Sequence, residues 1–198
     1  PAHGATYAWI MKPDESVSPN APTIVQAQEA LRKAPDWKTV AALVREHKRH
    51  PVYDCVIGSS GGKDSHWIVI KALELGLRPL VVTATTDILT EIGRRNILNL
   101  RELGVDSLEF SPDPTVRRKI MRIALEEVGD IEWGEHASIF GLPLRIAQDM
   151  GIGVVLYGEN PQREYSFGSD AAQSAAVLDR AWRERYGGLL GLRPRDFI

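Results

Sequence analysis

An α/β fold built on a doubly wound parallel sheet is predicted by three observations on the sequence. From residue 52 onward, short apolar runs alternate with segments whose apolar residues recur at helical spacing. Glycines follow two of the helical segments, at Gly76 and Gly104, as they commonly follow helices. Polar clusters come directly after three of the apolar runs, at the strand ends where parallel sheets bind ligands. The 198 residues, 43% of them hydrophobic, suffice for one such core, so we expect one domain.

The first 50 residues are expected to form an N-terminal lead-in with helices. Four prolines and no sustained period in residues 1–22 predict irregular structure there. Thr23 and Asp36 are residue types that cap the amino ends of helices, and each precedes a segment of helical character. The helices that these caps predict cover residues 24–33 and 37–50.

The remaining elements follow in strict alternation. The apolar runs predict strands at residues 52–57, 78–83, 106–110 and 153–157. The amphipathic segments predict helices at residues 66–75, 91–103, 115–128, 137–150 and 174–186. We expect the fourth of these helices in spite of Pro143, which lies inside its period.

The strongest functional signal is the segment 59–65, Ser-Ser-Gly-Gly-Lys-Asp-Ser, between the first of these strands and its helix. Two adjacent glycines let the backbone approach a phosphate, while the N–H groups opening the helix point at it. The string lacks the spacing of a Walker A motif. The predicted polyphosphate site comprises Ser59, Ser60, Gly61, Gly62, Lys63, Asp64 and Ser65.

Residues 60–65 resemble the SGGxDS signature of the PP-loop ATP pyrophosphatases, which split ATP between its α and β phosphates. With residues 53–58, this segment forms the first of five separated blocks of likeness; the other four are residues 91–96, residues 136–139, residues 158–162 with 164–165, and residues 191–198. Together they make residues 37–198 similar to the N-acetyl sugar amidotransferases, a group of that superfamily that acts in making amidino-sugars for surface polysaccharides. The resemblance implies a Rossmann-like fold of the PP-loop type, with the ATP pyrophosphatase domain at residues 51–198.

The resemblance also implies a reaction. The acetamido oxygen of a nucleotide-linked sugar attacks the α-phosphate of ATP, pyrophosphate leaves, and ammonia displaces AMP to give an amidine. ATP and Mg²⁺ are then the cofactors, and a glutaminase partner supplies the ammonia. The paired zinc-binding cysteines of the family have no counterpart in residues 1–50, and residues 132–135 contain no cysteine. The ATP half of the chemistry therefore transfers better than the substrate half.

Attack on an α-phosphate needs donors and a cation, which assigns roles to residues at the strand ends. Thr83 could bond adenine through its main chain, and Gly158 joins the nucleotide-binding set. Asp64 could cap the loop or hold Mg²⁺, and Glu159 could hold Mg²⁺ or take a proton from ammonia. The catalytic candidates are Lys63, Asp64, Glu159 and Asn160, and the substrate-binding candidates are His136 and Arg163.

Composition restricts the alternatives. A net charge of −2 predicts no basic surface, so nucleic acid is not the favoured partner. The one cysteine, Cys55, lies in an expected buried strand, which excludes an internal disulfide and disfavours a cysteine relay. A sulfur-inserting PP-loop enzyme acting on a base or tRNA stays open if sulfide is free, as does a non-catalytic subunit that binds adenine nucleotide. We expect a cytoplasmic protein without a membrane span, and its oligomeric state stays open, a homo-oligomer included.

Overall fold

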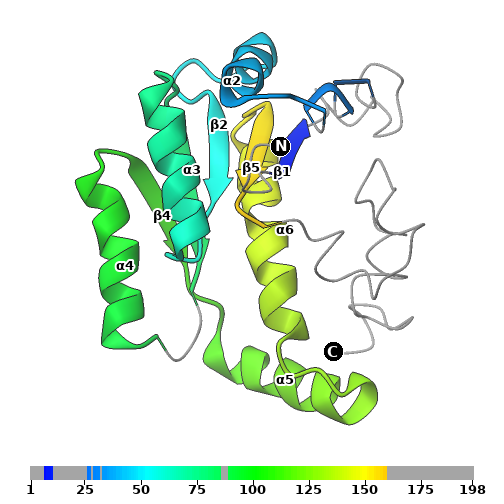
Figure 1. Cartoon of the computed structure of the whole chain (residues 1–198). Helices are drawn as coiled ribbons and strands as arrows, with labels where there is room; N and C mark the ends of the chain where they lie inside the picture. The colour runs from blue at the N-terminus through cyan, green and yellow to red at the C-terminus, as the bar shows by residue number, and fades with distance from the viewer. Residues whose placement is uncertain (1–6, 11–25, 28, 32, 86–88, 160–198) are drawn as a thin grey trace.

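The computed structural model describes residues 7–10, 26–27, 29–31, 33–85 and 89–159 of the chain. Its centre is a five-stranded sheet of order β1-β5-β2-β3-β4 (Figure 1). The strands are β1 (Tyr7–Ile10), β2 (Cys55–Gly58), β3 (Pro79–Ala84), β4 (Asp106–Phe110) and β5 (Val154–Tyr157). Strands β5, β2, β3 and β4 run parallel, and β1 pairs antiparallel with β5 at one edge. The predicted parallel α/β sheet is confirmed.

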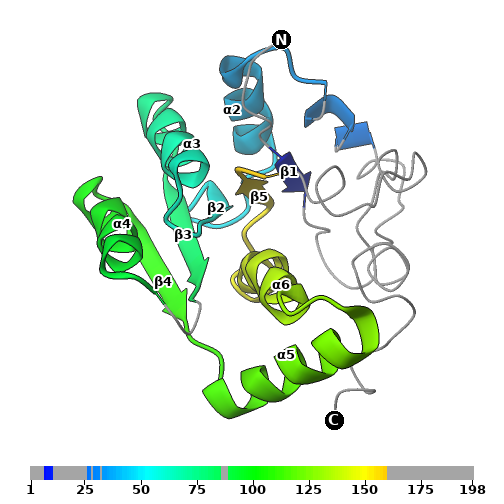
Figure 2. The ribbon, with the colours of Figure 1, turned by 60° about the horizontal axis from the view of Figure 1, so that its bottom comes forward.

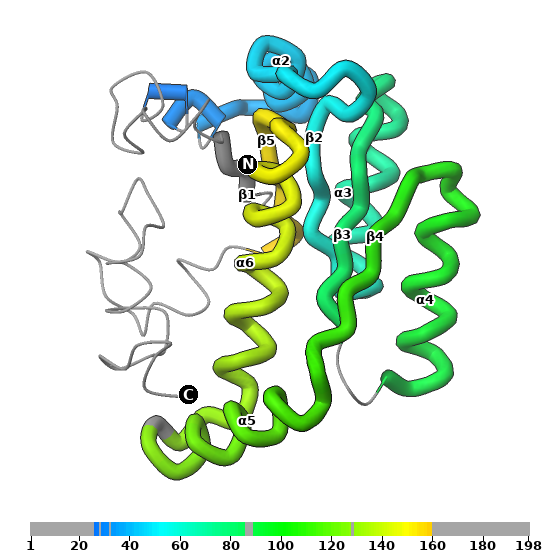
Figure 3. The backbone as a smooth tube through the Cα atoms, turned by 180° about the vertical axis from the view of Figure 1, so that it is seen from behind, coloured from blue at the N-terminus to red at the C-terminus, as the bar shows by residue number. Residues whose placement is uncertain are grey.

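Helices cover both faces of the sheet. They are α2 (Trp37–Glu46), α3 (Lys63–Glu74), α4 (Glu91–Glu102), α5 (Pro114–Val128) and α6 (Trp133–Asp149). Figures 2 and 3 show α2, α3 and α4 on one face and α6 on the other, with α5 crossing beyond the carboxyl ends of the strands. Helix α5 contacts α6 rather than lying on the sheet. Within the described ranges, no helix has both the length and the apolar character needed to cross a lipid bilayer.

Two apolar clusters hold these layers together. Cys55 and Ile57 of β2 pack toward α2 and α3, while Val56 between them packs toward α6. This alternation continues in β3 and β5, so the three central strands are buried along their whole length. Burial on both faces explains why these strands appear in the sequence as continuous apolar runs rather than as alternating patterns.

The structure differs from the sequence prediction at both ends of the region that precedes the first parallel strand. Strand β1 lies within residues 1–22, where irregular structure was predicted, and it is an edge strand fixed by the backbone of β5. Helix α2 ends at Glu46 instead of residue 50, because His47 leaves the helical conformation (φ −98°, ψ 9°) and the next amide, of Lys48, donates to the Arg45 carbonyl in a tighter turn. Asp36 caps this helix as predicted, accepting from the Thr39 amide at 2.8 Å. The division of the chain after residue 50 remains a prediction.

Helix α6 begins at Trp133, four positions earlier than predicted, because Gly134 in its first turn serves packing rather than chain reversal. A Cβ at Gly134 would lie 2.7 Å from Cγ2 of Ile120, so only glycine lets α5 approach α6 this closely. The predicted helix at residues 174–186 lies outside the described residues. Within the range 24–33, where a helix was predicted, the described residues 26–27 and 29–31 are helical and Lys33 lies in a turn.

Candidate functional site

Successive strands are added on one side of β2 as β3 and β4, and then on its other side as β5. A pocket lies beyond the carboxyl ends of β2 and β5. From β2 the chain passes to α3 on one face, whereas β5 is reached from α6 on the other. Open α/β sheets bind their ligands at such a switch point. We call this hollow the switch-point pocket. It is lined by Gly58, Ser59, Ser60, Gly62, Asp64, Ser65, Ile139, Phe140, Tyr157, Gly158 and Glu159.

The glycine segment opens α3 onto this pocket. Gly61 has φ +80°, a left-handed conformation that glycine adopts without strain, and a Cβ there would lie 2.9 Å from Cγ1 of Ile97. Gly62 is the N-cap of α3 and therefore brings no capping side chain. The amides of the first helical turn thus have no acceptor within the described part of the chain, which suits them to bind an anion.

Two serines of the segment hold its shape. The Gly61 amide donates to Ser59 Oγ at 3.1 Å, the Ser59 hydroxyl donates to Ser65 Oγ at 2.9 Å, and the Ser65 hydroxyl donates to the Gly62 carbonyl at 3.0 Å. Both serines are buried. Because the hydroxyl protons of Ser59 and Ser65 are both donated within the loop, these two serines stabilise its shape. The side chain of Ser60 is exposed, so its hydroxyl can donate to a ligand.

Lys63 and Asp64 stand at the mouth of the pocket. Their side chains form an ion pair, with Nζ 2.7 Å from Oδ2, and are 86% and 57% exposed. An ion pair this exposed contributes little to folding stability, so a ligand can replace it at small cost. Asp64 lines the switch-point pocket, whereas Lys63 does not line it in this conformation.

The loop after β5 closes the other side of the pocket. A Cβ at Gly158 would lie 3.1 Å from the Asp64 carbonyl carbon and from the Ser65 nitrogen, so glycine permits this loop to touch α3. Glu159 follows and lines the pocket together with Asp64. Two carboxylates suit Mg²⁺, and no group of three or more possible metal ligands occurs among the described residues. Such an ion would complete its coordination with phosphate oxygens and water.

The apolar wall of the pocket was missed at the sequence level. The Tyr157 hydroxyl donates to the Phe140 carbonyl at 2.7 Å, and the two rings lie 5.6 Å apart. Complete burial raises the pKa of Tyr157 well above its ordinary value. This hydrogen bond connects the end of β5 to α6 at Phe140, three residues before Pro143. The sequence feature that could have indicated it is the tyrosine at the last position of a buried strand.

The other predicted site residues are more scattered. Thr83 is buried within β3, paired with Glu109, and lines no described pocket. Its neighbours Ala84 and Thr85 line a second pocket instead. His136 lies on α6 with Nε2 3.8 Å from a carboxylate oxygen of Glu132, away from the switch-point pocket. Asn160 and Arg163 lie outside the described residues.

The second pocket lies between the end of β3, α5 and the first half of α6, and we call it the α5–α6 pocket. Ile139 lines both pockets, so they adjoin. Its lining residues are Ala84, Thr85, Pro112, Val116, Arg117, Ile120, Met121, Gly134, Glu135, Ser138 and Ile139. None of the residues contributed by α5 was a candidate in the sequence, because a helical period does not reveal which charged residue lines a pocket.

The chain matches no protein-family model and no curated protein. It is similar to a solved structure, that of NMN synthetase from Francisella tularensis, with 14% sequence identity. The alignment covers 87% of this chain and 72% of that chain, with a TM-score of 0.51. At this identity the likeness shows a shared fold, which agrees with the α/β sheet described above.

Proposed function

We propose that the chain is an ATP-dependent enzyme that forms AMP and pyrophosphate. The observation that carries the proposal is the uncapped amino end of α3, which opens on a pocket at the switch point of the sheet. Backbone amides and a helix dipole directed at one point favour a phosphate group there. The resemblance of residues 60–65 to the PP-loop signature supports a nucleoside triphosphate as the source of that phosphate.

The residues of the pocket suit an attack on the α-phosphate. Ser60, Lys63 and the amides of the first turn of α3 would hold the phosphate oxygens, on which negative charge increases during the reaction. Asp64 and Glu159 would hold Mg²⁺, which neutralises the pyrophosphate leaving group. The apolar wall of Ile139, Phe140 and Tyr157 excludes water from the adenylylated substrate.

The acceptor belongs to the finer part of the proposal. The similarity of residues 37–198 to the N-acetyl sugar amidotransferases favours an amide oxygen of a nucleotide-linked sugar as the nucleophile. Ammonia from a glutaminase partner would then displace AMP and give an amidine. Glu159 lines the pocket, and as an alternative to holding Mg²⁺ it would take a proton from the incoming ammonia. Asn160 and Arg163 follow it in the chain and keep their proposed roles toward the acceptor.

Sulfur insertion is the second candidate, and the position of the thiol argues against it. Cys55 has no exposed surface, and burial raises the pKa of its thiol well above the ordinary value. The thiolate is the nucleophile in sulfur relays, so a buried protonated thiol cannot carry sulfur to the pocket. A subunit that binds nucleotide without catalysis would share the pocket and differ only in releasing no pyrophosphate.

The products of ATP labelled in its α-phosphate test the proposal. With Mg²⁺, ammonium and a panel of N-acetylated nucleotide-sugars, we expect labelled AMP and release of pyrophosphate. Lys63→Ala and Asp64→Ala should each lower turnover by about ten- to a hundredfold, the effect of losing one charge-assisted contact. Lys71→Ala, at the other end of α3, is the matched control and should change little. Release of ADP and orthophosphate would contradict attack at the α-phosphate.

A further inference from the structure

Strand β4 is an open edge of the sheet. Among the described residues it pairs only with β3, at the side of the sheet opposite β1 (Figure 1). The Thr85 amide donates to the Phe110 carbonyl at 2.8 Å, so the N–H and C=O groups of Phe110 face β3. These groups alternate in direction along a strand, so those of Ser107 and Glu109 face away from the sheet. They are directed to where a further strand would lie.

The side chains of β4 do not oppose such pairing. Natural edge strands are commonly protected by lysine, proline or a bulge. Strand β4 contains neither residue type and pairs with β3 in a continuous register. Each of its carboxylates has a partner: the Tyr53 hydroxyl donates to Oδ2 of Asp106 at 2.9 Å, and two arginines of α4 form ion pairs with Glu109. The edge therefore carries no unpaired carboxylate that would repel a second strand.

The strand is self-complementary about Leu108. When two copies of β4 run antiparallel with Leu108 opposite itself, Ser107 of each copy lies opposite Glu109 of the other. Ser107 and Glu109 are the residues whose peptide groups face outward. This register therefore forms a hydrogen-bonded residue pair on each side of the two-fold axis, and Leu108 occupies the non-hydrogen-bonded position between them.

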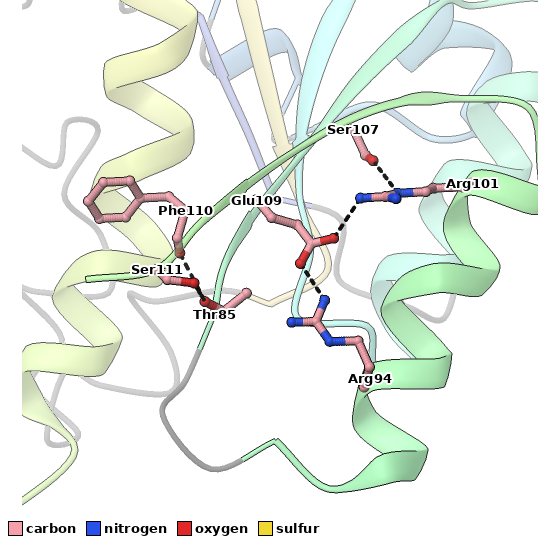
Figure 4. Close-up of polar contacts among 7 residues, drawn as sticks. All are labelled: Thr85, Arg94, Arg101, Ser107, Glu109, Phe110 and Ser111. Atoms are coloured by element: carbon pink, nitrogen blue, oxygen red, sulfur yellow. Dashed lines mark hydrogen bonds and ion pairs between the residues drawn. The ribbon is translucent and has the colours of Figure 1, made fainter. Parts of the chain in front are cut away.

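Charge matches in the same register. Nη2 of Arg101 lies 2.9 Å from Oε1 of Glu109, and its Nε donates to Ser107 Oγ at 3.3 Å (Figure 4). Residues directly opposite in antiparallel strands have Cβ atoms about 4.5–5.5 Å apart, so a guanidinium at Ser107 reaches Glu109 of the second copy. Glu109 also pairs with Arg94, which leaves one positive charge per copy for the carboxylate of the other.

Exposed apolar side chains lie on both faces of this edge. Leu108 and Phe110, on the face opposite α4, are 43% and 52% exposed. Leu98 of α4 is 41% exposed and stands at helical spacing from both arginines, on the side of α4 that reaches β4. In the two-fold pair Leu108 contacts its own copy, and α4 lies beside α4 of the second copy with Leu98 between them. A second copy thus covers apolar surface on both sides of the sheet.

We propose that the chain forms a two-fold dimer in which β4 pairs antiparallel with β4 of a second copy, so that two five-stranded sheets become one continuous sheet. Leu108 lies on the axis, and Arg101 of each copy contacts Glu109 of the other. No residue of β4 lines the switch-point pocket, so the dimer does not depend on the proposed function.

Sedimentation of the full chain over a dilution series tests the dimer. We expect the wild type to be dimeric at micromolar concentration. Leu108→Lys and Leu108→Glu each place like charges opposite one another and should raise the dissociation constant by about tenfold or more. An equimolar mixture of the two variants should restore the dimer, because opposite charges then meet at the axis. Leu125→Lys, at a leucine of α5 that is 55% exposed, is the matched control and should dimerise as the wild type does.

Hydrogen exchange of the wild type is a measurement that needs no variant. The amides of Ser107 and Glu109 should exchange faster on dilution to the monomer, whereas the amide of Phe110, which faces β3, should not change. A wild-type chain that is monomeric throughout the series would overturn the proposal, as would a dimer that neither variant at Leu108 weakens. Failure of the mixture to restore a dimer that both variants weaken would overturn the two-fold register at Leu108.

Discussion

Cys55 lies in β2 without exposed surface, and burial raises the pKa of its thiol, with the neighbouring Asp54 carboxylate adding to the effect. We expect the folded protein to resist iodoacetamide at pH 8 and to react once it is unfolded in urea, since only the thiolate is alkylated. Cys55→Ala should cost about 1 kcal/mol of stability and leave turnover intact. Rapid alkylation of the native protein, or persulfide on Cys55, would favour sulfur chemistry instead.

The serine chain in the glycine segment gives a second prediction for single residues. Ser65→Ala removes the acceptor of the buried Ser59 hydroxyl, so the free energy of unfolding should fall by roughly 1–2 kcal/mol. Ser60→Ala removes an exposed hydroxyl and should leave stability unchanged while weakening ATP binding. Urea denaturation and calorimetry distinguish the two effects. Equal losses of stability in Ser65→Ala and Ser60→Ala would show that the hydrogen bonds of Ser59 and Ser65 do not stabilise the loop.

At the scale of the element, α5 depends on its own cap because it does not lie on the sheet. Asp113 accepts from the amides of Thr115 and Val116, at 2.7 and 3.4 Å, and the Thr115 bond is the main reason that the pKa of Asp113 is lowered. A carboxyl whose folded pKa is lowered stabilises the fold above its unfolded pKa, about 3.9, and loses this contribution as pH falls through the folded pKa.

Asp113→Ala should therefore lower the melting temperature at pH 7, and the difference from the wild type should shrink as the pH falls below about 4. Asp113→Asn should retain most of the capping at neutral pH. Asp149→Ala, which removes a carboxylate in an exposed ion pair at the end of α6, is the control and should have little effect. A difference for Asp113→Ala that persists unchanged at low pH would contradict capping by the carboxylate.

The edge of the sheet carries its own element-scale feature. Glu109 of β4 accepts from Arg94 at 2.5 Å and from Arg101 at 2.9 Å, and Arg101 also donates to Ser107, so α4 is clamped to the edge strand (Figure 4). Glu109→Gln should weaken both ion pairs and speed hydrogen exchange in α4. Exchange in the central strands should not change, because they are buried by other helices. Unchanged exchange in α4 would show that apolar contacts alone hold it.

At the scale of the whole molecule, the sequence predicted what depends on local patterns. The buried strands and the amphipathic helices were found within a few residues, since burial on two faces leaves continuous apolar runs. Strand β1 was not found, because a four-residue edge strand depends on its pairing with β5. The glycine segment was recognised from its residues, whereas the buried Tyr157 and the partly buried Arg117 and Glu135 were not, because the exposure of a polar side chain is set by elements distant in sequence. The role of Thr83 in binding adenine remains a prediction, and the structure places Ala84 and Thr85 at the neighbouring pocket instead.

The pairing of β2 with β5 joins Val56 to Val155, about a hundred positions later in the chain. The glycine segment and α3 can form from local contacts, but the Gly158 side of the pocket appears only when β5 has inserted between β1 and β2. A nucleotide thus binds the complete pocket only after β5 has paired with β2. ATP should then slow unfolding more than it accelerates refolding, because it binds the native state and not the state in which β5 is still unpaired.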